Sequence, residues 1–171
     1  MIELMILGFL AESPLHGYEL RRKMEGLHGY SRSMSDGTVY PAIKRLVNLG
    51  MLSEQVEEGN AGPRKKILSL TGLGRKRLES VLRGASGHFI TDQSRFFVVL
   101  AFLSQLPSAE ERNAVLKRRL DYLDQPKTSF FFENGKPLKA ADLNDEYREG
   151  IFITARAARN AEIKWLKKKL S

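Results

Sequence analysis

The sequence contains no cysteine among its 171 residues, which excludes a disulfide framework and a thiolate metal site. Histidine is also scarce. The three histidines stand far apart, at positions 16, 28 and 88, and form no metal-binding motif such as HExxH. No serine stands in a GxSxG motif, and the glycine cluster TGLGRK lacks the strand context and spacing of a phosphate loop. We therefore predict no catalytic site, no metal site and no cofactor.

Long apolar runs are missing as well. The longest one, FFVVLAFL, covers residues 96–103, whereas a membrane-spanning helix needs about 20 residues. The N-terminal segment has an acidic residue near its start and lacks both a basic leader and a small-residue cleavage site. We therefore expect a cytoplasmic protein that does not enter a membrane.

Positive charge is what the chain has in excess. It carries 28 Lys and Arg against 20 Asp and Glu, a formal net charge of +8. Such an excess favours a polyanionic partner, because lysines and arginines that replace the counterions along a phosphate backbone gain affinity. Many basic proteins bind no nucleic acid, so the positions of the charges, and not their number, must indicate whether this chain binds one.

The first half of the chain shows a specific order of predicted elements. Apolar periodicity indicates helices over 2–11, 17–27 and 36–49, two strands over 52–56 and 66–70, and a helix over 72–84 capped by Thr71. Three helices, a two-stranded hairpin and a helix are the order of a winged helix-turn-helix domain. In that architecture the third helix enters the major groove and the hairpin, the wing, touches the neighbouring backbone. The inward residues expected on the last helix are Leu73, Leu78, Val81 and Leu82.

The third helix has two different faces. Ser35 is the expected N-cap and Gly50 the expected C-cap residue. The buried face is predicted to be Val39, Ile43 and Leu46, because these residues recur at helical spacing. The opposite face is predicted to contain Gly37, Pro41, Lys44 and Asn48, flanked by Thr38, Tyr40 and Arg45. Because this face combines a glycine and a ring-closed proline with polar side chains, a large partner can approach it closely.

Pro41 allows two interpretations of where this helix begins. If Ser35 is the cap, Pro41 removes one intrahelical hydrogen bond. If the helix effectively begins at Thr38, the proline lies in the first turn and costs little. Both leave a ring-closed residue on the outward face.

The second half of the chain indicates further helices. Residues 84–87 are read as a break between a domain at 1–84 and a domain at 88–171. Asp92 is the expected cap of a helix that Pro107 ends, and SAEE (108–111) is a capping box for a helix to about Tyr122. A loop over 125–142 contains the run Phe130–Phe132. The final helix, from about Leu143, carries a stripe at spacings of three and four, which is typical of helices that pair: Leu143, Tyr147, Ile151, Thr154, Ala158, Ala161 and Trp165.

Three motifs in order resemble the PadR-type transcriptional regulators: HGYEL (16–20), SDGTVYPAIKRLVNLGML (35–52) and GPRKKILSLTGLG (62–74). The second half is similar to the longer members of that family in length and helical pattern more than in motif. The chain departs from the family in the second wing strand, where Ile67 and Leu68 replace a common aromatic pair. The fold class implied is mainly α with a small two-stranded wing, a winged helix-turn-helix followed by a C-terminal α-helical dimerisation domain.

The resemblance implies a homodimer that binds double-stranded DNA at a palindromic operator, usually as a repressor, with activation left open. The residues that align with family DNA contacts are Tyr18, Ser35, Thr38, Tyr40 and Lys44, with Arg64 and Lys65 in the wing. Their chemistry fits these roles. Hydroxyls at a helix N-terminus suit a phosphate, and a lysine on the outward face suits a guanine edge or a phosphate. The run Arg75–Arg77 is interpreted as a solvated helix face.

Two alternatives stay open. Relatives respond to small aromatic or apolar effectors, so Phe96, Tyr147, Ile151 and Trp165 are candidates for an effector pocket; the alternative is core and dimer-interface packing, which aromatic residues do by default. The alternative function is a winged-helix module that binds another protein. That module should expose apolar side chains on the third helix, where this chain places Lys44, Arg45 and Asn48.

Overall fold

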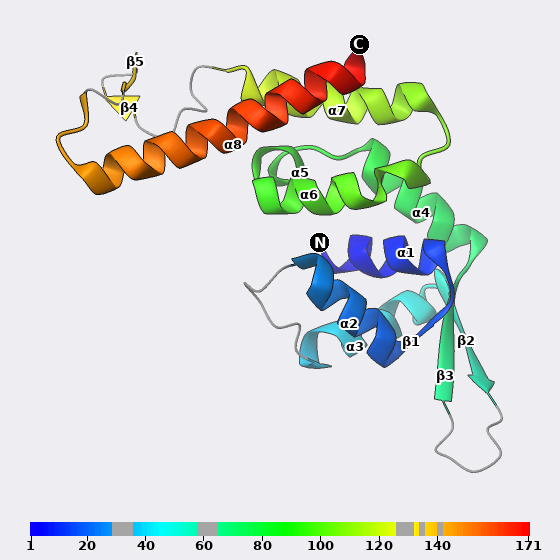
Figure 1. The fold of residues 1–171 in the computed structure, drawn as a ribbon. Helices are drawn as coiled ribbons and strands as arrows, with labels where there is room; N and C mark the ends of the chain where they lie inside the picture. The colour runs from blue at the N-terminus through cyan, green and yellow to red at the C-terminus, as the bar shows by residue number, and fades with distance from the viewer. Residues whose placement is uncertain (29–35, 58–64, 126–131, 134–135, 140–141) are drawn as a thin grey trace. The chain divides into compact units, whose positions relative to one another are not determined.

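The computed structural model describes residues 1–28, 36–57, 65–125, 132–133, 136–139 and 142–171 (Figure 1). Within these ranges the chain is mostly helical, with a three-stranded and a two-stranded antiparallel sheet. It forms two compact units, Met1–Ala109 and Glu110–Ser171. The predicted mainly α fold class is confirmed.

The first unit is built around helix α1 (Ile2–Glu12). This helix contacts four others, which are α2 (Gly17–His28), α3 (Asp36–Asn48), α4 (Gly72–Arg83) and α6 (Gln93–Phe102). Because neighbours surround it, five consecutive residues, Leu4 to Gly8, are buried. That is why its sequence is apolar on nearly every side and shows little amphipathic contrast.

Helix α6 belongs to this first unit, together with the short helices α5 (His88–Thr91) and η2 (Leu103–Gln105). It packs closely on α1, where Gly8 has no side chain and an added Cβ would lie 2.5 Å from the Phe102 ring. Phe96 and Phe102 are fully buried. The apolar run expected in the C-terminal domain therefore completes the core of the winged-helix unit. The compact units divide after Ala109.

The wing is a three-stranded sheet in the order β1 (Leu15–His16), β3 (Lys65–Leu70) and β2 (Leu52–Glu57). Strands β2 and β3 confirm the predicted hairpin to within one residue at each end. Strand β1 was not predicted, because two residues that follow a proline carry no detectable alternation. It pairs antiparallel with β3, placing His16 opposite Ile67.

The turn after α3 is a Schellman motif. Gly50 has φ +69°, its N–H donates to Val47 O (2.9 Å), and the Met51 N–H donates to Leu46 O (2.9 Å). These bonds satisfy carbonyls at the helix end and direct the chain into β2. The prediction of Gly50 as the C-cap glycine is confirmed.

Thr71 caps α4, as predicted. Its Oγ1 accepts a hydrogen bond from Gly74 N (3.1 Å) and donates to Gly50 O (2.7 Å). The Thr71 N–H also donates to Met51 O (3.1 Å). One residue thereby joins the turn after α3 to the beginning of α4.

The predicted inward face of α4 is wrong at one position. Leu78 and Leu82 are fully buried and Val81 is half-buried, but Leu73 is 52% exposed. The inward position of the first turn belongs to Gly74, four residues before Leu78. A side chain has no room there, since an added Cβ would lie 2.1 Å from Met51 O.

The second unit contains α7 (Ala109–Leu123), a short hairpin of β4 (Phe132–Glu133) and β5 (Lys136–Pro137), and α8 (Glu146–Leu170). Asp145 caps α8 by accepting from two backbone N–H groups at 2.9 Å. Both helices match the predicted spans closely. Phe130 and Phe131 of the aromatic run lie outside the described residues, as does the side chain of Phe132.

A buried ion pair joins α7 to α8. Arg119 Nε lies 2.7 Å from Glu162 Oε1, and Arg119 Nη2 lies 3.0 Å from Glu162 Oε2. Arg159 of α8 also donates to Leu123 O at the end of α7 (3.0 Å from Nε). Along the described ranges, no helix combines the length and the hydropathy that crossing a membrane requires.

Candidate nucleic-acid interface

Helix α3 presents one buried and one exposed face. Val39, Ile43 and Leu46 are buried in the core of the first unit, which confirms the predicted buried face. Of the residues predicted to face outward, Pro41, Lys44 and Asn48 are exposed, and so is the flanking Thr38. The apolar stripe therefore fixes which side chains of α3 can meet a partner.

Pro41 lies inside α3, which begins at Asp36. These bounds match the first of the two interpretations, in which the proline removes one intrahelical hydrogen bond. Ser35, the predicted cap, lies outside the described residues. Pro41 is on the exposed side, where its ring fills no core space.

Two tyrosines stand beside the outward face of α3. The Tyr40 ring lies over Gly17, where an added Cβ would be 3.0 Å from Tyr40 Cε1. The Tyr18 ring stacks on His16, with centroids 5.9 Å apart and planes 8° apart. Both rings are exposed in large part, Tyr18 at 54% and Tyr40 at 43%, so their hydroxyls can meet a partner. In the free chain the Tyr18 hydroxyl donates to Glu19 Oε1 (3.3 Å).

A groove of about 680 Å³ lies between α3, the beginning of α2 and the wing. Its floor is apolar and includes Ile43, Val47 and Leu68. Its rim is polar, and the predicted contacts Tyr18, Tyr40 and Lys44 all line it. The structure therefore brings three of the predicted site residues together, from two helices.

The wing side of the groove carries residues that were not among the predicted contacts. Glu54 of β2 and Lys66 of β3 line it, and Lys66 Nζ lies 2.8 Å from Glu54 Oε2. His16 of β1 lies beside them, with Nδ1 3.1 Å from Lys66 O. Strand alternation could have placed Lys66 on the groove side, but only the pairing of β2 with β3 brings Glu54 to it.

The side chains of both predicted wing contacts lie outside the described residues. Arg64 lies outside the described residues. Lys65 begins β3, and its side chain also lies outside them. Their roles remain predictions.

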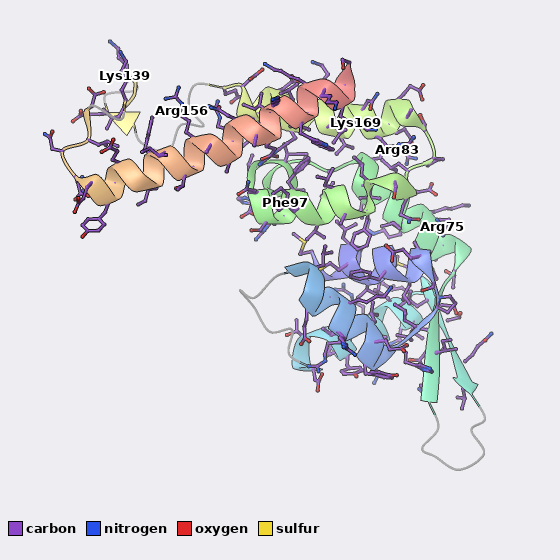
Figure 2. The ribbon with its side chains drawn as sticks, in the orientation of Figure 1. Arg75, Arg83, Phe97, Lys139, Arg156 and Lys169 are labelled. Carbon is purple, nitrogen blue, oxygen red and sulfur yellow. The ribbon has the colours of Figure 1, made fainter. Side chains whose placement is uncertain are left out.

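Several other cations are held by contacts inside the first unit. Glu3 of α1 accepts from Arg45 of α3 (3.3 Å) and from Arg77 of α4 (2.7 Å). Arg75, labelled in Figure 2, donates to Ala11 O (3.3 Å) and to Gln105 Oε1 (3.4 Å). Arg75, Lys76 and Arg77 are all exposed, as the interpretation of a solvated helix face predicts, and Arg75 and Arg77 also bind neighbouring elements from that face.

The candidate effector and interface residues fall into different units. Phe96 is a fully buried core residue of the first unit. Tyr147, Ile151 and Trp165 are exposed along α8, with Tyr147 at 78% and Trp165 at 43%. The inward residues of α8 are Phe152 and Leu166. Across the described part of the chain, no three His, Asp or Glu side chains gather as metal ligands.

Helices α1 to α4 with the antiparallel wing define a winged helix-turn-helix protein, and α3 stands in the position of its recognition helix. Residues 6–80 match the model of the transcriptional regulator PadR-like family. The chain belongs to this family, whose members are transcriptional regulators and not enzymes.

Several individual proteins are similar to this chain. The transcriptional regulator YqjI of Escherichia coli K12 is 33% identical over 78 residues, which are 46% of this chain and 36% of the relative. The match thus spans about a third of that curated relative. A PadR-like transcription factor from Bacteroides fragilis is 30% identical over 47% of this chain and 76% of its own, with TM-score 0.44. Bacillus subtilis PadR in complex with operator DNA is 20% identical over 100% of this chain and 98% of its own, with TM-score 0.48.

Proposed function

We propose that this protein is a sequence-specific, DNA-binding transcriptional regulator that acts as a homodimeric repressor on a palindromic operator. The observation that supports it best is the exposed face of α3. It carries Thr38, Lys44 and Asn48 opposite a fully buried apolar stripe. A polar, cationic helix face of this kind suits base edges and phosphates.

Each proposed contact has a chemical role. Lys44 points from α3 toward the base edges or a phosphate. Ser35 and Thr38, at the beginning of α3, meet a phosphate with their hydroxyls, where the positive end of the helix dipole also favours an anion. Tyr18 and Tyr40 offer hydroxyls from the rim of the groove, and the wing residues Arg64 and Lys65 hold the flanking backbone.

The dimer is proposed to form through α8. Tyr147, Ile151 and Trp165 recur along one stripe of this helix and are exposed in the single chain, which leaves apolar area for a second copy to cover. A two-fold axis would place the two α3 helices in successive major grooves, about 34–36 Å apart. A dimer bound there represses by occluding a promoter.

An apolar effector is the remaining part of the proposal. Tyr147 and Trp165 are its proposed contacts at the dimer interface. They lie about 27 Å apart along α8, so one ligand meets both only where the α8 helices of two copies run antiparallel. Phe96 belongs to the core of the first unit. Trp165 is the chain's single tryptophan, so its fluorescence reports on α8 directly. The probe is p-coumaric acid, the compound bound in one structure of Bacillus subtilis PadR. Saturable quenching in wild type, lost in Tyr147→Ala, supports the site, and unsaturable quenching contradicts it.

The test of DNA binding is fluorescence anisotropy with the promoter region of the protein's own gene, across a salt series. Lys44→Ala should weaken binding by about 1–3 kcal/mol if the lysine reads a base, or reduce the salt slope by about 0.9 if it contacts a phosphate. Arg64→Ala should weaken binding to all sequences and reduce the slope in the same way.

Arg45→Ala is the matched control, because it removes the neighbouring cation of α3, which Glu3 holds. It should leave the affinity nearly unchanged. Equal losses in Lys44→Ala and Arg45→Ala would contradict the assigned face. Wild-type binding no tighter than to random DNA, for this promoter and in a pulldown of genomic fragments, would favour the protein-binding alternative.

A further inference from the structure

The groove beside α3 holds a carboxylate among its cations. Glu54 lines the wing side, and Lys44 and Lys66 line the same groove. Phosphates repel a carboxylate, so a surface built only for affinity would not place one there. General attraction to DNA therefore does not explain the position of Glu54.

The wing sheet sets the geometry of this carboxylate. In the register of β2 and β3, Glu54 is opposite Leu68 and Val56 is opposite Lys66. Glu54 and Lys66 are thus diagonal neighbours on one face of the sheet, within reach of long side chains. Lys66 Nζ lies 2.8 Å from Glu54 Oε2, a short charge-assisted hydrogen bond.

Lys66 is held at both ends. Its main-chain carbonyl lies 3.1 Å from His16 Nδ1 of β1, while its ammonium group is held by β2. The lysine side chain is 59% exposed and that of Glu54 30%. The more accessible partner is therefore the cation that a phosphate would otherwise attract.

We propose that Glu54 weakens sequence-independent DNA binding, because it keeps the charge of Lys66 paired. This rests on the proposed function. A lysine adds to non-specific affinity when its charge displaces counterions from the phosphates. A lysine already neutralised by a carboxylate displaces fewer. Discrimination between sequences is then left to the exposed face of α3.

The experiment measures binding to a random-sequence duplex between 50 and 200 mM salt. Glu54→Gln keeps the size and hydrogen-bonding capacity of the side chain and removes its charge. It should bind about tenfold more tightly at 50 mM salt and about threefold more tightly at 200 mM, with a salt slope steeper by about 0.9.

Lys66→Gln completes a double-mutant cycle. In the wild-type background it should leave the salt slope unchanged, because Glu54 already pairs the lysine. In the Glu54→Gln background it should return the slope to the wild-type value. Equal effects of Lys66→Gln in both backgrounds would overturn the proposal, since the two residues would then act independently.

Glu12→Gln is the control for net charge. Glu12 also pairs with a lysine, at 3.7 Å from Lys23 Nζ, but it does not line the groove. A gain in Glu12→Gln equal to that in Glu54→Gln would reduce the effect to overall charge and overturn the proposal. An unchanged salt slope in Glu54→Gln with a lower melting temperature would show a purely structural pair. If no variant binds any duplex at 50 mM salt, the proposed function itself fails, and the proposed role of Glu54 fails with it.

Discussion

Adding one methyl group at Gly74 should destabilise the first unit, although alanine favours helices. Gly74 lies in the first turn of α4, and its missing Cβ would lie 2.1 Å from Met51 O. That is more than 1 Å shorter than the 3.4–4 Å of ordinary van der Waals contact. The carbonyl cannot move freely, because it accepts a hydrogen bond from Thr71 N (3.1 Å).

The expected magnitude follows from two opposing effects. Overpacking a tight contact costs about 1–3 kcal/mol, or more where backbone must move. Replacing glycine by alanine in a helix gains at most about 1 kcal/mol. We expect Gly74→Ala to lower the free energy of unfolding by about 2 kcal/mol, a melting temperature lower by about 10 °C for a unit of this size.

Gly72→Ala is the internal comparison, two residues earlier in the same helix. Gly72 has nothing within 4 Å of an added Cβ, so alanine should raise the free energy of unfolding by about 0.5 kcal/mol. Circular dichroism in urea and on heating measures both variants. Gly74→Ala as stable as wild type, or Gly72→Ala as unstable as Gly74→Ala, would refute the reasoning from the Met51 contact.

Three further predictions concern the two units. Arg119→Leu should cost about 3–5 kcal/mol, because it leaves the Glu162 carboxylate buried without its partner, and Arg119→Leu with Glu162→Leu should recover most of this in urea unfolding. Thr71→Ala should cost about 1–2 kcal/mol through loss of the α4 cap, whereas Thr71→Ser should stay close to wild type in the same assay. Trp165→Ala should weaken the proposed self-association in sedimentation velocity without lowering helix content; a dimer of unchanged affinity would remove α8 from the interface.

Local patterns were sufficient to predict most elements of this chain. The stripe Val39, Ile43 and Leu46 identified the buried face of α3, and with it the exposed face that carries Lys44. Gly50 and Thr71 marked the end of one helix and the beginning of another. These features depend on residues a few positions apart, whose geometry a helix or a turn fixes by itself.

Features that depend on distant residues could not be predicted in this way. The run 96–103 is recognisably buried from its composition, but its composition does not say which core it fills. The structure places it on α1, where Gly8 makes room for Phe102. Leu73 resembled a core residue, yet the close approach of Met51 O gave the inward position to a glycine.

The candidate site shows the same division. Tyr18, Tyr40 and Lys44 were predicted from the sequence, and the structure brings them to one groove. The roles of individual charges were decided by tertiary contacts, since Glu3 holds Arg77 from 74 positions away. Periodicity specifies the face on which a side chain lies. Only the packing of separate elements decides whether its charge is paired within the fold or remains available to a partner.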